Sequence, residues 1–172
     1  MQDGLTRWAR ASLRLLNSSR TFRRLYAHIS YDEVNRAMFA NLREHDRMLA
    51  DRVRVEAYER ALRAHMKEGD IVIDLGTGSG ILSLLAARSK PARIYALDHS
   101  NIIAIARAAA RHNGVDCIQF ECVSSREFSL DHRVDVIIHE QIGDFLFEEN
   151  MVENVVDLRD QLLKPGGRIL PN

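Results

Sequence analysis

A glycine-rich segment after an apolar run is the part of this chain with the clearest chemical meaning. Residues 71–75 read Ile-Val-Ile-Asp-Leu, and Gly76, Gly78 and Gly80 follow before helical spacing begins. Glycines let the backbone amides of a strand-to-helix loop, and the start of the next helix, approach a ligand closely. The spacing differs from the G-x-G-x-x-G of dinucleotide sites, and Asp74 suits a ligand that carries an amine. We predict a site for a nucleotide-like cofactor; a tight turn without a ligand is the alternative.

A second acidic residue closes the next apolar run. Asp98 follows Ile-Tyr-Ala-Leu and lies 22 residues after Gly76. A carboxylate at this offset accepts both ribose hydroxyls in nucleotide-binding folds. The offset fits NAD and S-adenosylmethionine equally, and a surface acid at a strand end is the alternative. With Asp74 and the three glycines, Asp98 is predicted to form one cofactor site.

A pair of glutamates follows the apolar run 134–138. His139 and Glu140 come directly after this run, and Glu149 follows Glu140 after eight intervening residues. Glu140 should lie at the carboxyl end of a strand, and the intervening loop could bring Glu149 close to it. Two nearby carboxylates repel each other unless a cation lies between them or one is protonated. The pair therefore predicts a positively charged substrate, although a helix dipole alone would also favour Glu149 in a first helical turn.

The elements that must position these residues alternate between strands and helices. Apolar runs at 71–75, 94–97, 117–120, 134–138 and 168–170 are separated by helical segments at about 79–89, 100–113 and 149–163. This order predicts right-handed crossovers and a mostly parallel sheet of about five strands, with ligands at the carboxyl ends of the strands. The expected fold class is therefore α/β, Rossmann-like, with helices in front of the first strand.

The N-terminal part of the chain reads as helical. One or two arginine-rich helices are expected from Leu5 to about Ile29, and a second helical region from Tyr31 to about Met66, broken near residues 44–46. We predict an arginine-rich helical extension, residues 1–30, followed by one cofactor-binding domain, residues 31–172. The basic extension is expected to be a solvated helical face, and contact with an acidic partner is the alternative.

Bulk composition excludes several classes of protein. The 172 residues are 46% hydrophobic, and 24 basic residues balance 24 acidic ones. This balance argues against a dedicated nucleic-acid or anionic-membrane surface, and one core is expected. The chain shows no signal-peptide core or long uncharged apolar run, so we predict a cytoplasmic protein. Cys117 and Cys122 should point to opposite faces of a strand, so we expect neither a disulfide nor a metal site.

Several segments together resemble the cofactor domain of protein arginine methyltransferases. They are Val72-Ile-Asp-Leu-Gly-Thr-Gly-Ser-Gly-Ile-Leu-Ser, Ile94-Tyr-Ala-Leu-Asp, His139-Glu-Gln-Ile-Gly and Leu163-Lys-Pro-Gly-Gly-Arg-Ile-Leu-Pro-Asn. Residues 45–54, His-Asp-Arg-Met-Leu-Ala-Asp-Arg-Val-Arg, resemble the family's helix that closes over the cofactor. The resemblance covers about three quarters of the chain, from Phe39 to the end. It implies a class I methyltransferase that uses S-adenosyl-L-methionine and releases S-adenosyl-L-homocysteine.

The same resemblance implies roles for individual residues. Arg54 would pair with the methionine carboxylate of the cofactor, and Asp98 would bind its ribose. The other implied cofactor contacts are His45, Met48, Asp74, Gly76, Gly78, Gly80, Ser125, Arg126 and Glu140, with Asp74 or the glycine backbone at the amino-acid moiety and Ser125 or Arg126 at the adenine.

The resemblance also implies a mechanism. Glu140 and Glu149 would grip a guanidinium and draw its charge away from the attacking nitrogen during direct SN2 transfer. One of them, or His139, would take the proton as the nitrogen is methylated. His139 stands where the family generally has serine, and an imidazole there could titrate near neutral pH.

The function expected from these observations is N-methylation of a guanidino or amino group. The family's C-terminal β-barrel substrate domain is expected to be absent from the chain, so the substrate could be a cationic small molecule or an arginine-containing protein. A catalytically inactive cofactor-binding partner or scaffold subunit is the alternative. An NAD-linked oxidoreductase is a third reading, disfavoured by the glycine spacing. We expect no nucleic-acid or membrane partner, and the arginine-rich helices could serve as a contact in a homodimer.

Overall fold

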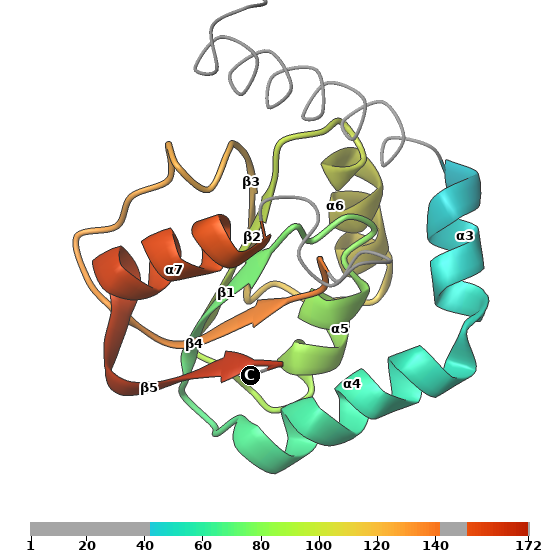
Figure 1. Ribbon diagram of the computed structural model, residues 1–172. Helices are drawn as coiled ribbons and strands as arrows, with labels where there is room; N and C mark the ends of the chain where they lie inside the picture. Colours follow the sequence, from blue (N-terminus) through green and yellow to red (C-terminus); the bar gives the residue numbers. More distant parts are fainter. Residues whose placement is uncertain (1–41, 142–150, 172) are drawn as a thin grey trace, which may run out of the picture. The chain divides into compact units, whose positions relative to one another are not determined.

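Five strands form one parallel sheet in the order β3-β2-β1-β4-β5 (Figure 1). The computed structural model describes residues 42–141 and 151–171. The strands are β1 (Ile71–Leu75), β2 (Arg93–Asp98), β3 (Ile118–Cys122), β4 (Val134–His139) and β5 (Leu163–Leu170). The strand order reverses between β1 and β4, and ligands of open α/β sheets bind at the carboxyl ends of the strands at such a reversal. The predicted α/β fold with a parallel five-stranded sheet is therefore confirmed.

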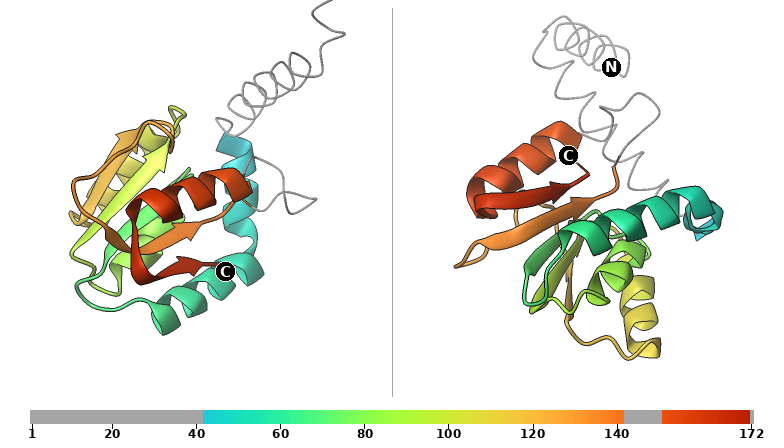
Figure 2. Two further views of the ribbon diagram at one scale, coloured as in Figure 1. Left: turned by 60° about the vertical axis from the view of Figure 1, so that its left-hand side comes forward. Right: turned by 90° about the horizontal axis from the view of Figure 1, so that it is seen from below.

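Helices cover both faces of this sheet. The helices of the described residues are α3 (Leu42–Ala50), α4 (Arg52–His65), α5 (Ile81–Ala87), α6 (Ile103–His112) and α7 (Met151–Leu162). Side chains of α4, α5 and α6 pack in one hydrophobic cluster with Val72 and Ile138, while α7 packs in a second cluster with Ile73 and Ile137. Figure 2 shows α7 on the opposite side of the sheet from α4, α5 and α6. Because both faces are covered, the strands read as nearly continuous apolar runs.

The last strand is longer than its apolar run. We predicted a strand at 168–170, but β5 begins at Leu163, which pairs with Val134. The ladder is irregular between Val134 and Val136, and it resumes where Arg168 pairs with Val136. A regular ladder would not accept the segment Lys-Pro-Gly-Gly. The irregularity allows this segment to lie within β5.

The break between α3 and α4 does not lie at residues 44–46, as the sequence predicted. Helix α3 runs through His45 to Ala50, and the break is at Asp51. The Asp51 carboxylate accepts a hydrogen bond from the Arg54 backbone amide at 3.1 Å, as an N-cap residue does. The new helix start is therefore set by this cap. No helix in residues 42–141 or 151–171 is long and apolar enough to cross a membrane.

The glycine that begins α5 leads to a testable prediction about stability. Gly80 has φ +84°, and a Cβ there would lie 2.9 Å from the Ala106 Cβ and 3.2 Å from the Ala106 Cα. We expect Gly80→Ala to lower the free energy of unfolding by about 3 kcal/mol, because left-handed backbone strain adds to a collision with α6. Urea denaturation at neutral pH measures this.

The matched control for that variant is Gly114→Ala. Gly114 also has a positive φ, +66°, but a Cβ there would meet nothing within 4 Å. Backbone strain alone should then cost about 1–2 kcal/mol. Equal losses in the two variants would show that close packing of α6 against Gly80 contributes nothing.

Candidate functional site

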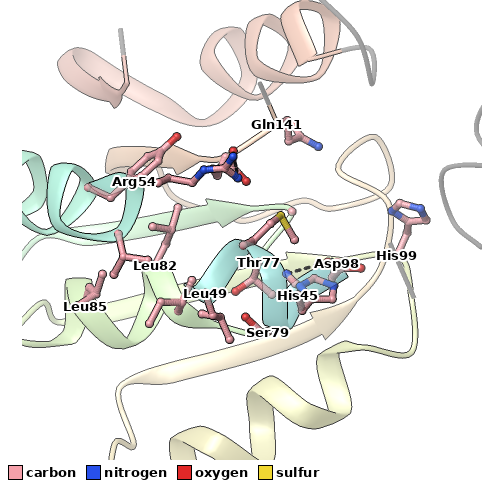
Figure 3. Close-up of a pocket in the computed structure, with 17 residues that line it drawn as sticks. His45, Leu49, Arg54, Thr77, Ser79, Leu82, Leu85, Asp98, His99 and Gln141 are labelled. Atoms are coloured by element: carbon pink, nitrogen blue, oxygen red, sulfur yellow. Dashed lines mark hydrogen bonds and ion pairs between the residues drawn. The ribbon is translucent and has the colours of Figure 1, made fainter. Parts of the chain in front are cut away.

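A pocket opens at the carboxyl ends of β1, β2 and β4, next to α3 and α4 (Figure 3). Its wall brings together many of the residues that the sequence predicted to act on a cofactor or substrate: His45, Met48, Arg54, Gly76, Gly78, Asp98 and Glu140. Apolar side chains complete one side of the pocket: Leu49, Val55, Ile81, Leu82 and Leu85. The arrangement offers an apolar surface with a cation, Arg54, and an acid, Asp98, at separate positions.

The glycine loop allows α3 to approach closely. His45 in α3 is 7% exposed, and a Cβ on Gly78 would lie 2.7 Å from the His45 Cε1. Gly78 also has φ +52°, a conformation that residues with a Cβ rarely adopt. A larger residue at 78 would therefore push α3 away from the pocket.

Several backbone amides of this loop bond within the protein, although the glycines predicted amides that face a ligand. The amides of Gly76 and Thr77 both donate to the Leu97 carbonyl at 2.9 Å. The Gly78 amide donates to Asp98 at 2.9 Å. The glycines are thus needed for close packing of side chains around the loop rather than for exposed N–H groups.

The Asp98 carboxylate is largely occupied by the protein. Its Oδ2 accepts the Gly78 amide, and its Oδ1 accepts the amide and hydroxyl of Ser100 at 2.8 and 2.6 Å. A carboxylate has about four acceptor positions, so about one remains, on Oδ2. In this arrangement Asp98 can take one ligand hydroxyl, whereas we predicted two.

Asp74 does not line the pocket. Its side chain is fully buried, and Oδ2 accepts hydrogen bonds from the hydroxyls of Thr77 and Ser83 at 2.7 and 2.6 Å. Its Oδ1 is buried and has no hydrogen-bond partner within the described residues. Asp74 therefore links the end of β1 to the glycine loop and to α5. It lies beneath the cofactor site that we predicted it to contact.

Burial of Asp74 predicts a dependence of stability on pH. Burial raises the pKa of Asp74 from 3.8 to about 6, against the lowering effect of the Ser83 and Thr77 hydrogen bonds. The folded state thus holds this proton more tightly than the unfolded chain does. The contribution of Asp74 to stability is therefore greatest below about pH 4 and is lost as the pH rises to about 6.

Asp74→Asn isolates this effect, because asparagine does not titrate. Relative to the natural chain, the variant should gain about 3 kcal/mol in free energy of unfolding between pH 4 and pH 6 and then stay level. Urea denaturation at several pH values measures the difference. Asp116→Asn is the control, since Asp116 is exposed. A difference that does not change with pH would contradict the raised pKa.

Glu140 lies in the pocket beside a cation. The Arg54 Nη1 donates to the Glu140 Oε1 at 3.5 Å, and the Arg54 Nε lies 3.6 Å from the Asp51 Oδ2. Burial raises the pKa of Glu140, and Arg54 acts against that rise. Burial, followed by the charge of Glu140, also raises the pKa of Tyr58. Glu140 is therefore a partly desolvated carboxylate that can bind a cation and accept a proton.

Four more of the predicted site residues do not line the pocket. His139 is 4% exposed, and side chains alternate along a strand, so it shares the α7 face with Ile137 rather than the face of Glu140. Burial lowers the pKa of His139. The other predicted residues outside the pocket wall are Gly80, Ser125 and Arg126. Glu149 lies outside the described residues, and all of these roles stay predictions.

The structure adds residues that the sequence reasoning did not single out. Tyr58 lines the pocket one helical turn after Arg54, a spacing that could have pointed to it. His99 and Gln141 line the pocket directly after Asp98 and Glu140. The carboxamide of Gln141 packs against the glycine loop, with Nε2 3.2 Å from the position of a Cβ on Gly76. No pattern in the sequence indicated this contact.

Three comparisons with known proteins all find methyltransferases. The family model described as ribosomal protein L11 methyltransferase (PrmA) matches residues 52–170. The probable protein arginine N-methyltransferase 6 of Arabidopsis thaliana is 39% identical over 137 residues, which cover 78% of this chain and 32% of that protein. The chain spans about a third of the length of the curated relatives it matches.

Two solved structures are similar to this chain. That of Arabidopsis thaliana protein arginine methyltransferase 10 has a TM-score of 0.75 and 38% identity, and the match covers 78% of this chain and 40% of the other. The Trypanosoma brucei PRMT1 enzyme-prozyme heterotetrameric complex with AdoHcy has a TM-score of 0.73 and 34% identity, covering 77% of this chain and 43% of the other.

Proposed function

Because this chain belongs to the ribosomal protein L11 methyltransferase (PrmA) family of class I S-adenosylmethionine-dependent methyltransferases, we propose that it methylates a nitrogen of a cationic guanidino or amino group. Its resemblance to the cofactor domain of arginine methyltransferases is confirmed by these relatives. The observation that carries the substrate proposal is Glu140, a half-buried carboxylate that lines the pocket beside the glycine loop. A protein arginine side chain is the favoured acceptor, since the relatives are named for it.

The residues of the pocket fit S-adenosylmethionine. Arg54 is a cation suited to the methionine carboxylate, and the open acceptor position of Asp98 suits a ribose hydroxyl. His45 and Met48, both from α3, line the pocket, and His45 packs against Gly78 of the glycine loop. When bound, the cofactor supplies a methyl group activated by a sulfonium, so positioning of the acceptor nitrogen contributes most of the rate.

Glu140 performs two tasks in this proposal. Its carboxylate accepts charge-assisted hydrogen bonds from the N–H groups of the substrate, which holds the substrate cation in the pocket and draws positive charge away from the reacting nitrogen. Its raised pKa also suits it to take the proton that the nitrogen loses. Glu149 is proposed as the second carboxylate of the pair. His139, which the sequence offered as another proton acceptor, is buried and does not line the pocket.

A binding and a transfer experiment test this function. Calorimetry with S-adenosylhomocysteine and with NAD should show binding of the first and none of the second. Transfer of a labelled methyl group should be measured to an arginine-rich peptide, to its lysine counterpart and to free guanidino compounds. Transfer to the arginine peptide alone supports the favoured substrate. Preference for NAD would overturn the proposed function. Transfer to small guanidino compounds alone would show that the substrate is a small molecule and not a protein arginine.

A second candidate is a cofactor-binding partner without its own turnover. It is favoured by the similarity to the Trypanosoma brucei PRMT1 complex, which pairs an enzyme with a prozyme. Binding of S-adenosylhomocysteine without transfer to any of these acceptors would select this candidate. The cytoplasmic location, the homodimer and the division into residues 1–30 and 31–172 stay predictions.

A further inference from the structure

Gln141 carries a polar atom that the protein itself leaves unsatisfied. Gln141 lines the pocket, and its Oε1 is buried and accepts no hydrogen bond in the described part of the chain. An unpaired buried carbonyl oxygen is costly and calls for an explanation, and because Gln141 lines the pocket a bound ligand can supply the missing donor. The bound ligand should therefore bring an N–H or O–H donor to this carboxamide.

The position of the Gln141 carboxamide shows which part of the pocket its oxygen can serve. The Nε2, Cγ and Cδ of Gln141 lie 3.2, 3.4 and 3.5 Å from where a Cβ on Gly76 would be. Gly76 begins the glycine loop, directly after β1. In Figure 3 Gln141 and Arg54 border the upper side of the pocket, and His45 lies below. Gln141 is thus on the Arg54 side of the loop.

A cationic donor fits this position better than a neutral one. Gln141 directly follows Glu140, so two oxygen acceptors border this stretch of the pocket wall. In an amino acid one carbon separates the ammonium from the carboxylate. If Arg54 takes the carboxylate of the cofactor, the ammonium must lie within a few ångströms of it. Asp74, which the sequence assigned to that amine, is fully buried and does not line the pocket, and its Oδ2 accepts from Thr77 and Ser83.

We propose that the carboxamide oxygen of Gln141 accepts a hydrogen bond from the α-ammonium group of the bound cofactor. Gln141 is then a binding residue for the amino-acid end of the cofactor, and Asp74 only supports the loop beneath it. This inference rests on the proposed binding of S-adenosylmethionine and its product. It gives Gln141, which follows β4, the role of binding the cofactor amine that the sequence analysis gave to Asp74 in β1.

Calorimetry with two ligands tests the assignment without relying on activity. The ligands are S-adenosylhomocysteine and its analogue without the α-amino group, and the proteins are the natural chain, Gln141→Met and Gln141→Glu. Methionine keeps the length of the side chain and removes the acceptor. Gln141→Met should bind S-adenosylhomocysteine about tenfold to a hundredfold more weakly, as expected for a hydrogen bond to a charged group. Its affinity for the analogue should stay within about twofold, and Gln141→Glu should bind S-adenosylhomocysteine at least as tightly as the natural chain.

The controls separate this role from a packing role. Gln161→Met makes the same exchange on the exposed face of α7 and should change neither affinity. Equal weakening of both ligands by Gln141→Met would assign Gln141 to packing and overturn the inference, as would no weakening at all. If the natural chain bound neither ligand, the proposed function itself would fail; if it bound both ligands equally, only the role of Gln141 would fail.

Discussion

Glu140→Gln is expected to lower the rate of methyl transfer by about 10²–10³-fold, the loss typical of removing one group that stabilises charge in a transition state. Glutamine keeps the size of the side chain but has no negative charge and presents an NH₂ group to the substrate cation. It also cannot accept the proton released by the nitrogen. The measurement is the rate of labelled methyl transfer at saturating cofactor.

The same variant should leave binding of the cofactor product intact. Arg54 contacts Glu140 at 3.5 Å, and without the charge of Glu140 it stays available for the cofactor carboxylate. We therefore expect the affinity for S-adenosylhomocysteine to change far less than the rate of methyl transfer. Glu153→Gln, an exposed change in the first turn of α7, is the matched control and should keep full activity. Full activity in Glu140→Gln would remove Glu140 from the mechanism.

Arg54→Ala is expected to weaken binding of S-adenosylhomocysteine by about 10- to 100-fold, because a charge-assisted hydrogen bond to the carboxylate is lost. Arg54 is the cation that lines the pocket next to Glu140, and its side chain is 41% exposed, so solvent already screens part of its charge. Calorimetry measures the loss. A ligand without the carboxylate, such as decarboxylated S-adenosylmethionine, should bind the variant and the natural chain alike.

Arg52→Ala is the control for Arg54→Ala. Arg52 is the exposed first residue of α4 and does not line the pocket. The Arg52→Ala substitution removes the same charge as Arg54→Ala, from the same turn of α4. If Arg52→Ala weakened binding as much as Arg54→Ala did, the effect would come from the general field of the helix rather than from a contact at the pocket.

Much of the site could be predicted from the sequence because its parts are local. The apolar runs ending at Asp74, Asp98 and Glu140 predict strands, and parallel strands place their carboxyl ends at one edge of the sheet. The opposite facing of His139 and Glu140 could also have been inferred, since adjacent residues of a strand point to opposite faces. Gln141 could not, because its contact with Gly76 joins residues far apart in the sequence.

By itself, the sequence determined the α/β fold, the place of the pocket and the identity of the charged groups around it. These follow from strand and helix periods and from the position of each acid at a strand end. The tertiary structure decided which of those groups are available to a ligand. The Oδ2 of Asp74 is engaged by Thr77 and Ser83, and Asp98 by Gly78 and Ser100, whereas within the described residues Glu140 has a long contact with Arg54. The physical reason is that a carboxylate has few acceptor positions, and what fills them depends on packing around the glycine loop rather than on the spacing of the acids.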